Sequence, residues 1–246
     1  LAKPSNYERG QEYGKSVGNN LQFIEEIYEA HRKWLKEVSS SSDEIEPKLL
    51  VRCSSVDMMW SLHESALKLD SFTGINILAG ASREGMGKKH QFNDEGIESR
   101  EEFLGKMKNM SSTESAIILY YDILSEGINV ECITGVLFLN DTLPTKPKII
   151  QNTGRATRKH KIDAERFWRR EIKVGDGQWI KPYCAVILPI LDVNAEYTTA
   201  EISKMIKGLR DEFGFDPSFY VSEGNDLAKS KPKDELDDLN EKNRKM

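Results

Sequence analysis

The stretch AIILYYDILSEGINVECITGVLFL, residues 116–139, decides the fold class of this 246-residue chain. It holds two short apolar runs, 116–120 and 133–139, which are separated by a turn around Gly127. Neither run alternates strictly between apolar and polar residues, and both contain several β-branched side chains. This pattern predicts strands that are buried on both faces of a parallel sheet.

The rest of the chain repeats this arrangement of short apolar runs and intervening helical segments. Further apolar runs lie at 48–53, 75–79 and 183–191. Helices are predicted between the runs, at 56–69, 98–110 and 148–159. Strands that alternate with helices indicate an α/β fold, a doubly wound and mostly parallel sheet with helices on both faces. Pro189 indicates that the last strand ends there or lies at an edge of the sheet.

Segments of different composition flank this α/β region, 46–192. Residues 1–45 are predicted to form a linker and an amphipathic helix at 20–38, where apolar residues recur at helical spacing. Residues 193–225 are predicted to form a helical extension. The tail 226–246 has six acidic and six basic side chains and few apolar ones, so we expect it to be disordered. The chain begins with Leu1 rather than Met, which suggests a piece of a longer protein.

Composition excludes several classes of protein. The formal net charge is −5, so no overall basic field indicates nucleic acid, although a local patch remains possible. The three cysteines form no CxxC pair and the four histidines show no metal-ligand spacing, so we expect reduced thiols and no metal site. Neither a signal peptide nor an apolar run of membrane-spanning length is present. These features predict a cytoplasmic protein without a membrane partner.

Candidate ligand-binding residues follow the predicted strands, because ligands of open parallel sheets bind beyond the carboxyl ends of the strands. Ser54 and Ser55 lie between a strand and a helix, where hydroxyl and backbone N–H groups suit a phosphate. The alternative is that Ser55 only caps the helix. Ser125 and Glu126 follow the next such strand, in a sequence that is also ordinary for a loop.

A third candidate is the stretch KIIQNTGRATRKHK, residues 148–161, which follows another predicted strand. On a helix, Gln151, Arg155 and Arg158 stand at i, i+4 and i+7 and share one face. The arginines can bind phosphate in a bidentate manner. Gly154 lowers helix stability, and the close approach of a partner would account for it. The alternative is a solvated polar face.

The chain stays basic beyond this stretch. Residues 155–173 carry eight basic and three acidic side chains, a net charge of +5 in a protein whose overall charge is −5. Phe167 and Trp168 lie within this segment. A polyanion would find a favourable field here, whereas a solvated surface segment is the alternative.

Two of these stretches resemble motifs of the superfamily 2 helicases. QNTGRATR is similar to motif VI, Q-x-x-G-R-x-x-R, because Gln151, Gly154, Arg155 and Arg158 match every fixed position. DILSEGINVECITGVLF, which precedes it, resembles motif V, although Asn129 stands where the family often has Asp. KLLVRCSS, residues 48–55, lies where motif IV would. The resemblance covers about residues 46–192, and it is greatest to the restriction-enzyme-like helicases and translocases.

The resemblance implies a RecA-like domain with defined roles for its residues. Such enzymes hold ATP between two RecA-like domains, and the second reaches across with motif VI. Gln151 would contact the γ-phosphate or the attacking water, and Arg155 and Arg158 would be arginine fingers. The remaining residues would lie near the nucleotide (Glu126, Gly127, Asn129, Gly154) or contact the nucleic-acid backbone (Ser54, Ser55, Ser125, Lys159).

The sequence lacks the parts that hold ATP itself. It contains no G-x-x-x-x-G-K-[ST] loop, and SREGMGKK at 82–89 departs from that pattern at both ends. We therefore expect a second RecA-like domain that hydrolyses no ATP alone, with ATP and Mg²⁺ held mainly by an N-terminal RecA-like domain of the same protein. The expected polymer is nucleic acid, DNA in preference to RNA. The alternatives are a non-catalytic α/β module that binds nucleic acid or protein, and a scaffold that kept a RecA-like fold.

Overall fold

The structure is a computed structural model that describes residues 6–81, 100–121, 133–139 and 146–188. The chain divides into two compact units, Leu1–Leu191 and Asp192–Met246. Every described residue belongs to the first unit. The predicted helical extension, 193–225, and the predicted disordered tail, 226–246, lie outside the described residues.

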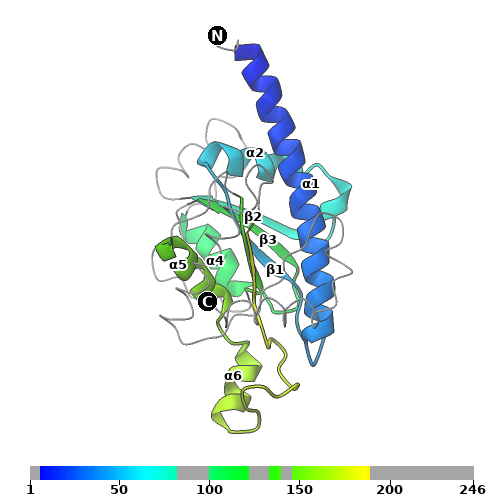
Figure 1. The fold of residues 1–246 in the computed structure, drawn as a ribbon, viewed down its shortest axis with the longest axis vertical. Helices are drawn as coiled ribbons and strands as arrows, with labels where there is room; N and C mark the ends of the chain where they lie inside the picture. The colour runs from blue at the N-terminus through cyan, green and yellow to red at the C-terminus, as the bar shows by residue number, and fades with distance from the viewer. Residues whose placement is uncertain (1–5, 82–99, 122–132, 140–145, 189–246) are drawn as a thin grey trace, which may run out of the picture. The chain divides into compact units, whose positions relative to one another are not determined.

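The centre of the first unit is a five-stranded sheet in the order β2-β3-β1-β4-β5 (Figure 1). All neighbouring strands pair in parallel. The predicted α/β class is therefore confirmed, and the parallel sheet fits a RecA-like fold. The strands are β1 Lys48–Arg52, β2 Asn76–Ala81, β3 Ala116–Tyr121, β4 Gly135–Phe138 and β5 Ala185–Ile187.

The strands became a buried parallel sheet because most of their side chains are apolar on both faces; Lys48 and Arg52, at the two ends of β1, are buried charged exceptions. Every residue of β1 and β4 is buried. Leu49 packs in the same apolar cluster as the helices of one face, whereas its neighbour Leu50, also buried, points to the opposite face. Burying each such side chain contributes about 1.5–3 kcal/mol. The short strand β5 is only partly buried and forms one edge of the sheet, as Pro189 led us to expect.

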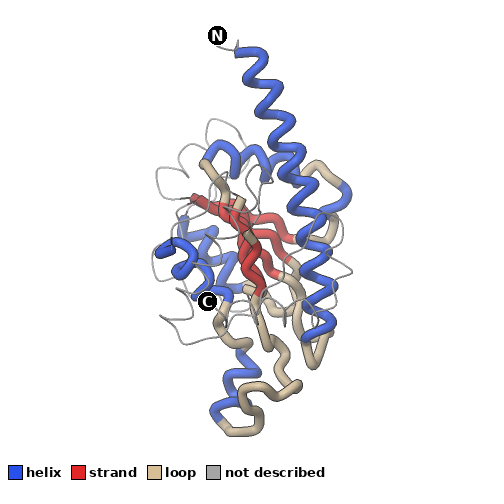
Figure 2. Tube along the Cα trace, in the orientation of Figure 1, coloured by secondary structure: helices blue, strands red, loops and turns tan. Residues whose placement is uncertain are grey.

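Helices cover both faces of the sheet, as predicted (Figures 1 and 2). On one face lie α1 (Asn6–Val38) and α2 (Val56–Ala66). On the other lie α4 (Arg100–Asn109) and α5 (Lys146–Ala156). A shorter helix, α6 (Lys161–Trp168), follows α5, and a 3₁₀ turn, Asp70–Phe72, follows α2.

Helix α1 is longer than its apolar spacing predicts, because it begins at Asn6 and not near residue 20. The predicted stripe is buried as expected, including Leu21, Ile24, Tyr28 and Leu35. Once this packed part has formed, each further turn of helix adds hydrogen bonds without a new nucleation cost. Propagation therefore extends the helix into a polar segment that carries no apolar signal of its own.

The contact between α4 and the sheet depends on one glycine. A Cβ atom at Gly80 of β2 would lie 2.5 Å from the nearest ring atom of Phe103, which is fully buried on α4. No real Cβ approaches another atom so closely, so the ring occupies the space that a side chain would take. This close approach seats α4 on the face of the sheet that α5 also covers.

Candidate functional site

The first candidate residues, Ser54 and Ser55, lie at the carboxyl edge of the sheet, where the strands end. Ser55 is the N-cap of α2, and its hydroxyl accepts a hydrogen bond of 3.1 Å from the backbone N–H of Met58. The capping interpretation of Ser55 is therefore confirmed. Ser54 is exposed and keeps its hydroxyl at the surface of this edge.

Four candidates from the predicted motif V lie outside the described residues. They are Ser125, Glu126, Gly127 and Asn129. The flanking strands are described, and the segment connects the carboxyl end of β3 to the amino end of β4. The roles of these four residues stay predictions.

Helix α5 carries most of the motif QNTGRATR, but it ends before the third predicted side chain. Gln151 is exposed, whereas Arg155 is only 8% exposed. The helix ends at Ala156, so Arg158 lies beyond it and is half-buried. Gln151 and Arg155 therefore keep the predicted i, i+4 spacing, whereas the predicted helix 148–159 ends before Arg158 and helical spacing does not place that residue.

Gly154 has open space around it. No described atom lies within 4 Å of the position that a Cβ would take, and the residue is exposed. Packing within the described residues therefore gives no reason for a glycine in this helix, where it costs about 1 kcal/mol relative to alanine. A surface that approaches α5 closely from outside would give one.

Arg155 lies inside its own domain. Burial lowers the pKa of its guanidinium group, and the nearby charge of Arg158 lowers it further, whereas Tyr120 at the end of β3 acts in the opposite direction. Tyr120 is itself buried. The two arginines are thus close enough to repel each other, an arrangement that an anion between them would stabilise.

The end of α5 lies at the amino edge of the sheet, opposite Ser54 and Ser55. Lys181, shortly before β5, is buried and its ammonium group donates hydrogen bonds of 2.6 Å to the carbonyl oxygens of Ala156 and Arg158. This cation satisfies carbonyl groups at a helix C-terminus, where positive charge is favourable. The expectation that all three candidate segments meet at the carboxyl edge is therefore wrong for the end of α5, because the helix runs back across the sheet.

Lys181 is held by a buried carboxylate. Asp163 of α6 is fully buried, and its two oxygens accept hydrogen bonds from the backbone N–H groups of Ile180 (2.9 Å) and Lys181 (2.8 Å). Asp163 thereby fixes the segment whose lysine caps α5. Sequence reasoning missed both residues, because a single Asp or Lys in a basic segment carries no sign of burial.

Further polar side chains are buried at the same edge of the sheet. The Nε2 atom of His31 on α1 is 2.8 Å from the hydroxyl oxygen of Thr134, which also accepts a 2.9 Å hydrogen bond from the backbone N–H of Lys48. The Lys48 ammonium group donates to the carbonyl oxygen of Ser112 at 3.0 Å. Gly135 makes room for the ring, because a Cβ there would lie 3.1 Å from His31.

The burial of His31 predicts a loss of stability in acid. Burial lowers its pKa from 6.5 to about 4, and the charge of Lys181 contributes in the same direction. Because the unfolded chain takes up the proton first as the pH falls, this stability is full above about pH 6.5 and is lost progressively towards pH 4. The expected loss by pH 5 is about 2 kcal/mol in the free energy of unfolding.

Urea unfolding at pH 7 and pH 5 measures this loss in the wild type and in His31→Gln. We expect the variant to show a smaller difference between the two pH values, because carboxylates elsewhere titrate equally in both proteins. An identical pH dependence in the two proteins would show that His31 does not titrate as its burial requires.

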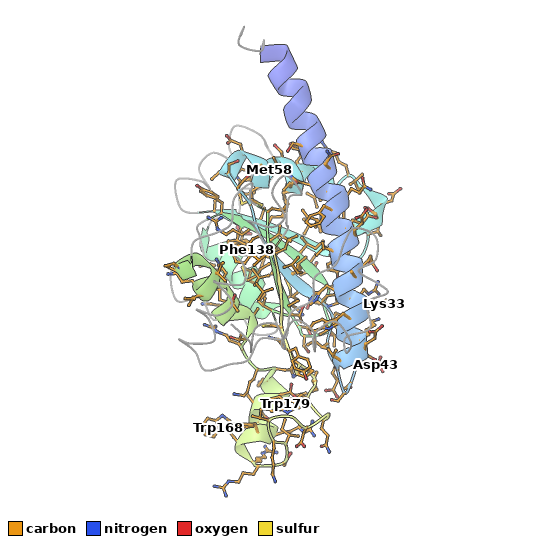
Figure 3. The ribbon with its side chains drawn as sticks, in the orientation of Figure 1. Lys33, Asp43, Met58, Phe138, Trp168 and Trp179 are labelled. Atoms are coloured by element: carbon orange, nitrogen blue, oxygen red, sulfur yellow. The ribbon has the colours of Figure 1, made fainter. Side chains whose placement is uncertain are left out.

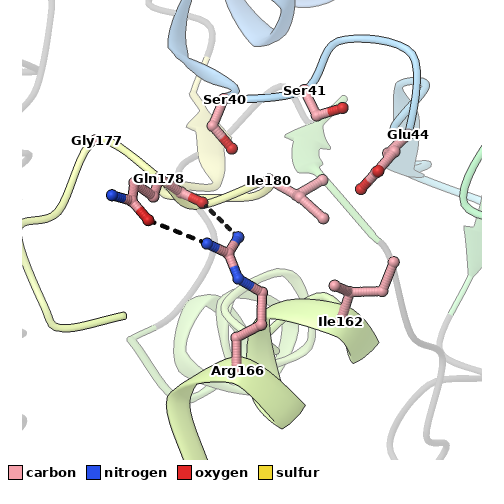
Figure 4. Close-up of a pocket in the computed structure, with 8 residues that line it drawn as sticks. All are labelled: Ser40, Ser41, Glu44, Ile162, Arg166, Gly177, Gln178 and Ile180. Atoms are coloured by element: carbon pink, nitrogen blue, oxygen red, sulfur yellow. Dashed lines mark hydrogen bonds between the residues drawn. The ribbon is translucent and has the colours of Figure 1, made fainter. Parts of the chain in front are cut away.

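A shallow pocket of about 430 Å³ lies between the loop after α1 and the α6 region (Figure 4). Arg166 spans it, and its guanidinium group donates to the backbone oxygen (2.9 Å) and the side-chain oxygen (3.1 Å) of Gln178. None of the predicted site residues lines it. The lining residues are Ser40, Ser41, Glu44, Ile162, Arg166, Gly177, Gln178 and Ile180.

Lys159 is exposed, and its ammonium group lies 4.8 Å from the centre of the Phe167 ring. This cation–π contact leaves the charge at the surface. In the described part of the chain, no three His, Cys, Asp or Glu side chains gather as a metal site requires. Within that part, too, no helix is both long and apolar enough to cross a membrane.

Comparison with known structures finds similarity to a helicase domain. The sequence matches no protein-family profile and no curated protein. The structure is similar to that of "Mss116p DEAD-box helicase domain 2 bound to an RNA duplex", with a TM-score of 0.37 and 15% sequence identity, over 83% of this chain and 77% of that one. A similarity of this size carries no information about ligands or activity. The α/β fold rests on the sheet topology.

Proposed function

We propose that this chain is the second RecA-like domain of an ATP-dependent helicase or translocase. ATP and Mg²⁺ would be held mainly by a first RecA-like domain, and this chain would supply Gln151, Arg155 and Arg158 to the phosphates. Nucleic acid, DNA in preference to RNA, would bind to this chain through its sugar-phosphate backbone. The other residues of the proposal are those near the nucleotide, Glu126, Gly127, Asn129 and Gly154, and those near the nucleic acid, Ser54, Ser55, Ser125 and Lys159.

The observation that carries this proposal is the surface of α5 around Gly154. The helix follows the inner strand β4, it begins the motif VI pattern that Arg158 completes, and its glycine faces open space beside the exposed Gln151. A second domain that packs there would account for the glycine.

A second candidate is a binding module without a nucleotide role, and the burial of Arg155 favours it. An arginine finger must reach a phosphate outside its own domain, whereas Arg155 is 8% exposed and lies near Tyr120. In this alternative Arg155 stabilises the fold, and the basic surface beyond α5 is the functional part.

Two observations test the proposal. Upstream of Leu1, the coding sequence should contain a strand–GxxxxGK[ST]–helix unit followed by an acidic box, which would hold ATP and Mg²⁺. The isolated chain should hydrolyse ATP no faster than background, with or without an oligonucleotide, because it lacks that loop. A start codon near Leu1, or clear turnover by the isolated chain, would contradict the proposal.

A further inference from the structure

Helix α6 ends in an exposed aromatic and basic surface, which we call the Trp168 tip and define as Trp168, Arg169, Arg170 and Lys173. Trp168 is 82% exposed, and the three cations are exposed as well. Figure 3 shows Trp168 on the outer side of α6. Among the described residues no carboxylate lies within ion-pair distance of these cations. A large exposed aromatic ring that is followed within five residues by three exposed cations is a feature that a ligand would explain.

The tip is exposed although the structure beneath it is well packed. Phe167, next to Trp168, packs against the buried Trp179 with 5.8 Å between the ring centres. The Trp179 indole N–H donates to the carbonyl oxygen of Lys173 at 2.8 Å, and the Lys173 N–H donates to Asp176 at 2.7 Å. These contacts fix the backbone of the tip, so its exposed side chains project from an ordered segment.

Arg170 occupies a backbone conformation that normally selects glycine. Its φ is 61°, in the left-handed region. Its N–H donates to the carbonyl oxygen of Phe167 (3.0 Å), and the next N–H, of Glu171, donates to that of Arg166 (2.9 Å). This is the Schellman pattern of helix termination, in which the left-handed position favours Gly. An arginine there costs about 1 kcal/mol or more, which suggests that its side chain is used.

We propose that the Trp168 tip binds single-stranded nucleic acid, with the indole stacked on a base and the cations on neighbouring phosphates. Base stacking on aromatic side chains beside a basic surface is the usual way in which proteins bind single strands. A duplex offers phosphates but no free base face for Trp168. The tip lies in the segment 155–173, whose charge of +5 contrasts with the −5 of the whole chain.

The inference rests on the proposed function for its ligand class but uses a different surface. Neither Ser54 and Ser55 nor the residues of α5 belong to the tip. A strand bound at the tip would be a second contact, outside the carboxyl edge of the sheet. Experiments can therefore show that the tip binds no nucleic acid even if ATP hydrolysis requires the residues of α5.

Binding of fluorescently labelled oligothymidylate and oligouridylate to the full chain, measured by anisotropy at several salt concentrations, tests the inference. We expect Trp168→Ala to weaken binding about tenfold to a hundredfold, the range found for loss of one stacked base. Trp168→Phe should retain part of the affinity. Val174→Ala is the matched control, because Val174 is 86% exposed in the same region and carries neither a ring nor a charge.

Arg170→Gly separates a binding role from a structural one. We expect it to weaken oligonucleotide binding and to reduce the salt slope by about one. The urea midpoint of Arg170→Gly should equal or exceed that of the wild type, because glycine adopts the left-handed conformation without strain. A residue with only a structural role would not change binding in this way.

Several results would overturn the inference. They are a wild-type chain that binds neither oligonucleotide, Trp168→Ala and Arg170→Gly variants with wild-type affinity, and equal binding of a duplex. If the wild type self-associates and Trp168→Ala abolishes this association without weakening oligonucleotide binding, the tip is a protein contact instead. The proposed function is judged separately, by the ATP hydrolysis of the protein that contains both RecA-like domains.

Discussion

Arg155→Ala should lower ATP hydrolysis by about 10³-fold or more in the protein that combines this chain with a first RecA-like domain. An arginine finger stabilises the charge that develops on the transferring phosphoryl group, and its loss has an effect of this size. We expect Arg158→Ala to act similarly. Nucleotide binding should fall far less, because the first domain holds most of the nucleotide. Steady-state hydrolysis with saturating nucleic acid, together with nucleotide affinity, measures both effects.

Stability measurements distinguish an arginine finger from a structural arginine. If Arg155 only supports the fold near Tyr120, Arg155→Ala lowers the urea midpoint, and hydrolysis changes little in the folded protein. Arg158→Ala leaves the cap on α5 in place, because Lys181 binds the backbone oxygen at position 158. Arg32→Ala is the matched control. Arg32 lies on α1, outside the motif, and its 3.7 Å ion pair with Glu46 is of the kind that contributes little to stability. Near-normal hydrolysis in both motif variants would refute the finger assignment.

Asp163→Ala should destabilise the chain by about 2–6 kcal/mol. The carboxylate is fully buried and accepts two backbone N–H groups, from Ile180 and Lys181. Each buried donor left without an acceptor costs about 1–3 kcal/mol. The same change frees the segment from which Lys181 caps α5. Urea unfolding followed by tryptophan fluorescence measures the effect, because Trp179 lies in this segment.

Two variants control this result. Asp163→Asn keeps the shape and one carbonyl oxygen, so we expect a smaller loss than with alanine. Asp43→Ala removes an exposed carboxylate from the loop after α1 (Figure 3) and should leave the urea midpoint nearly unchanged. Equal midpoints for Asp163→Ala and the wild type would show that the two hydrogen bonds contribute nothing to stability.

The fold class was predictable because it depends on burial of apolar side chains. The runs around Leu49, Ile77, Ile117 and Val136 have no polar face, so they could only become strands of a sheet that is covered on both faces. The apolar stripe of α1 was predictable for the same reason. The polar first turns of α1 were not, because helix propagation needs no apolar residue.

The site was less predictable because its geometry depends on where elements end. Gln151, Arg155 and Arg158 share a face only while the helix continues, and α5 ends at Ala156. The burial of Arg155 and the capping role of Lys181 depend on contacts between segments that are distant in sequence. No local pattern records such contacts, so the motif identified the residues but not their surroundings.

The central claim is that Arg155 acts on the transition state of ATP hydrolysis in another domain. The most direct measurement uses the protein that combines this chain with a first RecA-like domain. It compares the affinities of the wild type and of Arg155→Ala for ADP alone and for ADP with aluminium fluoride, which mimics the transferring phosphoryl group. We predict that the variant binds ADP nearly as well as the wild type but loses about 10³-fold in affinity for the fluoride complex. Equal affinities of the two proteins for the fluoride complex would contradict the account.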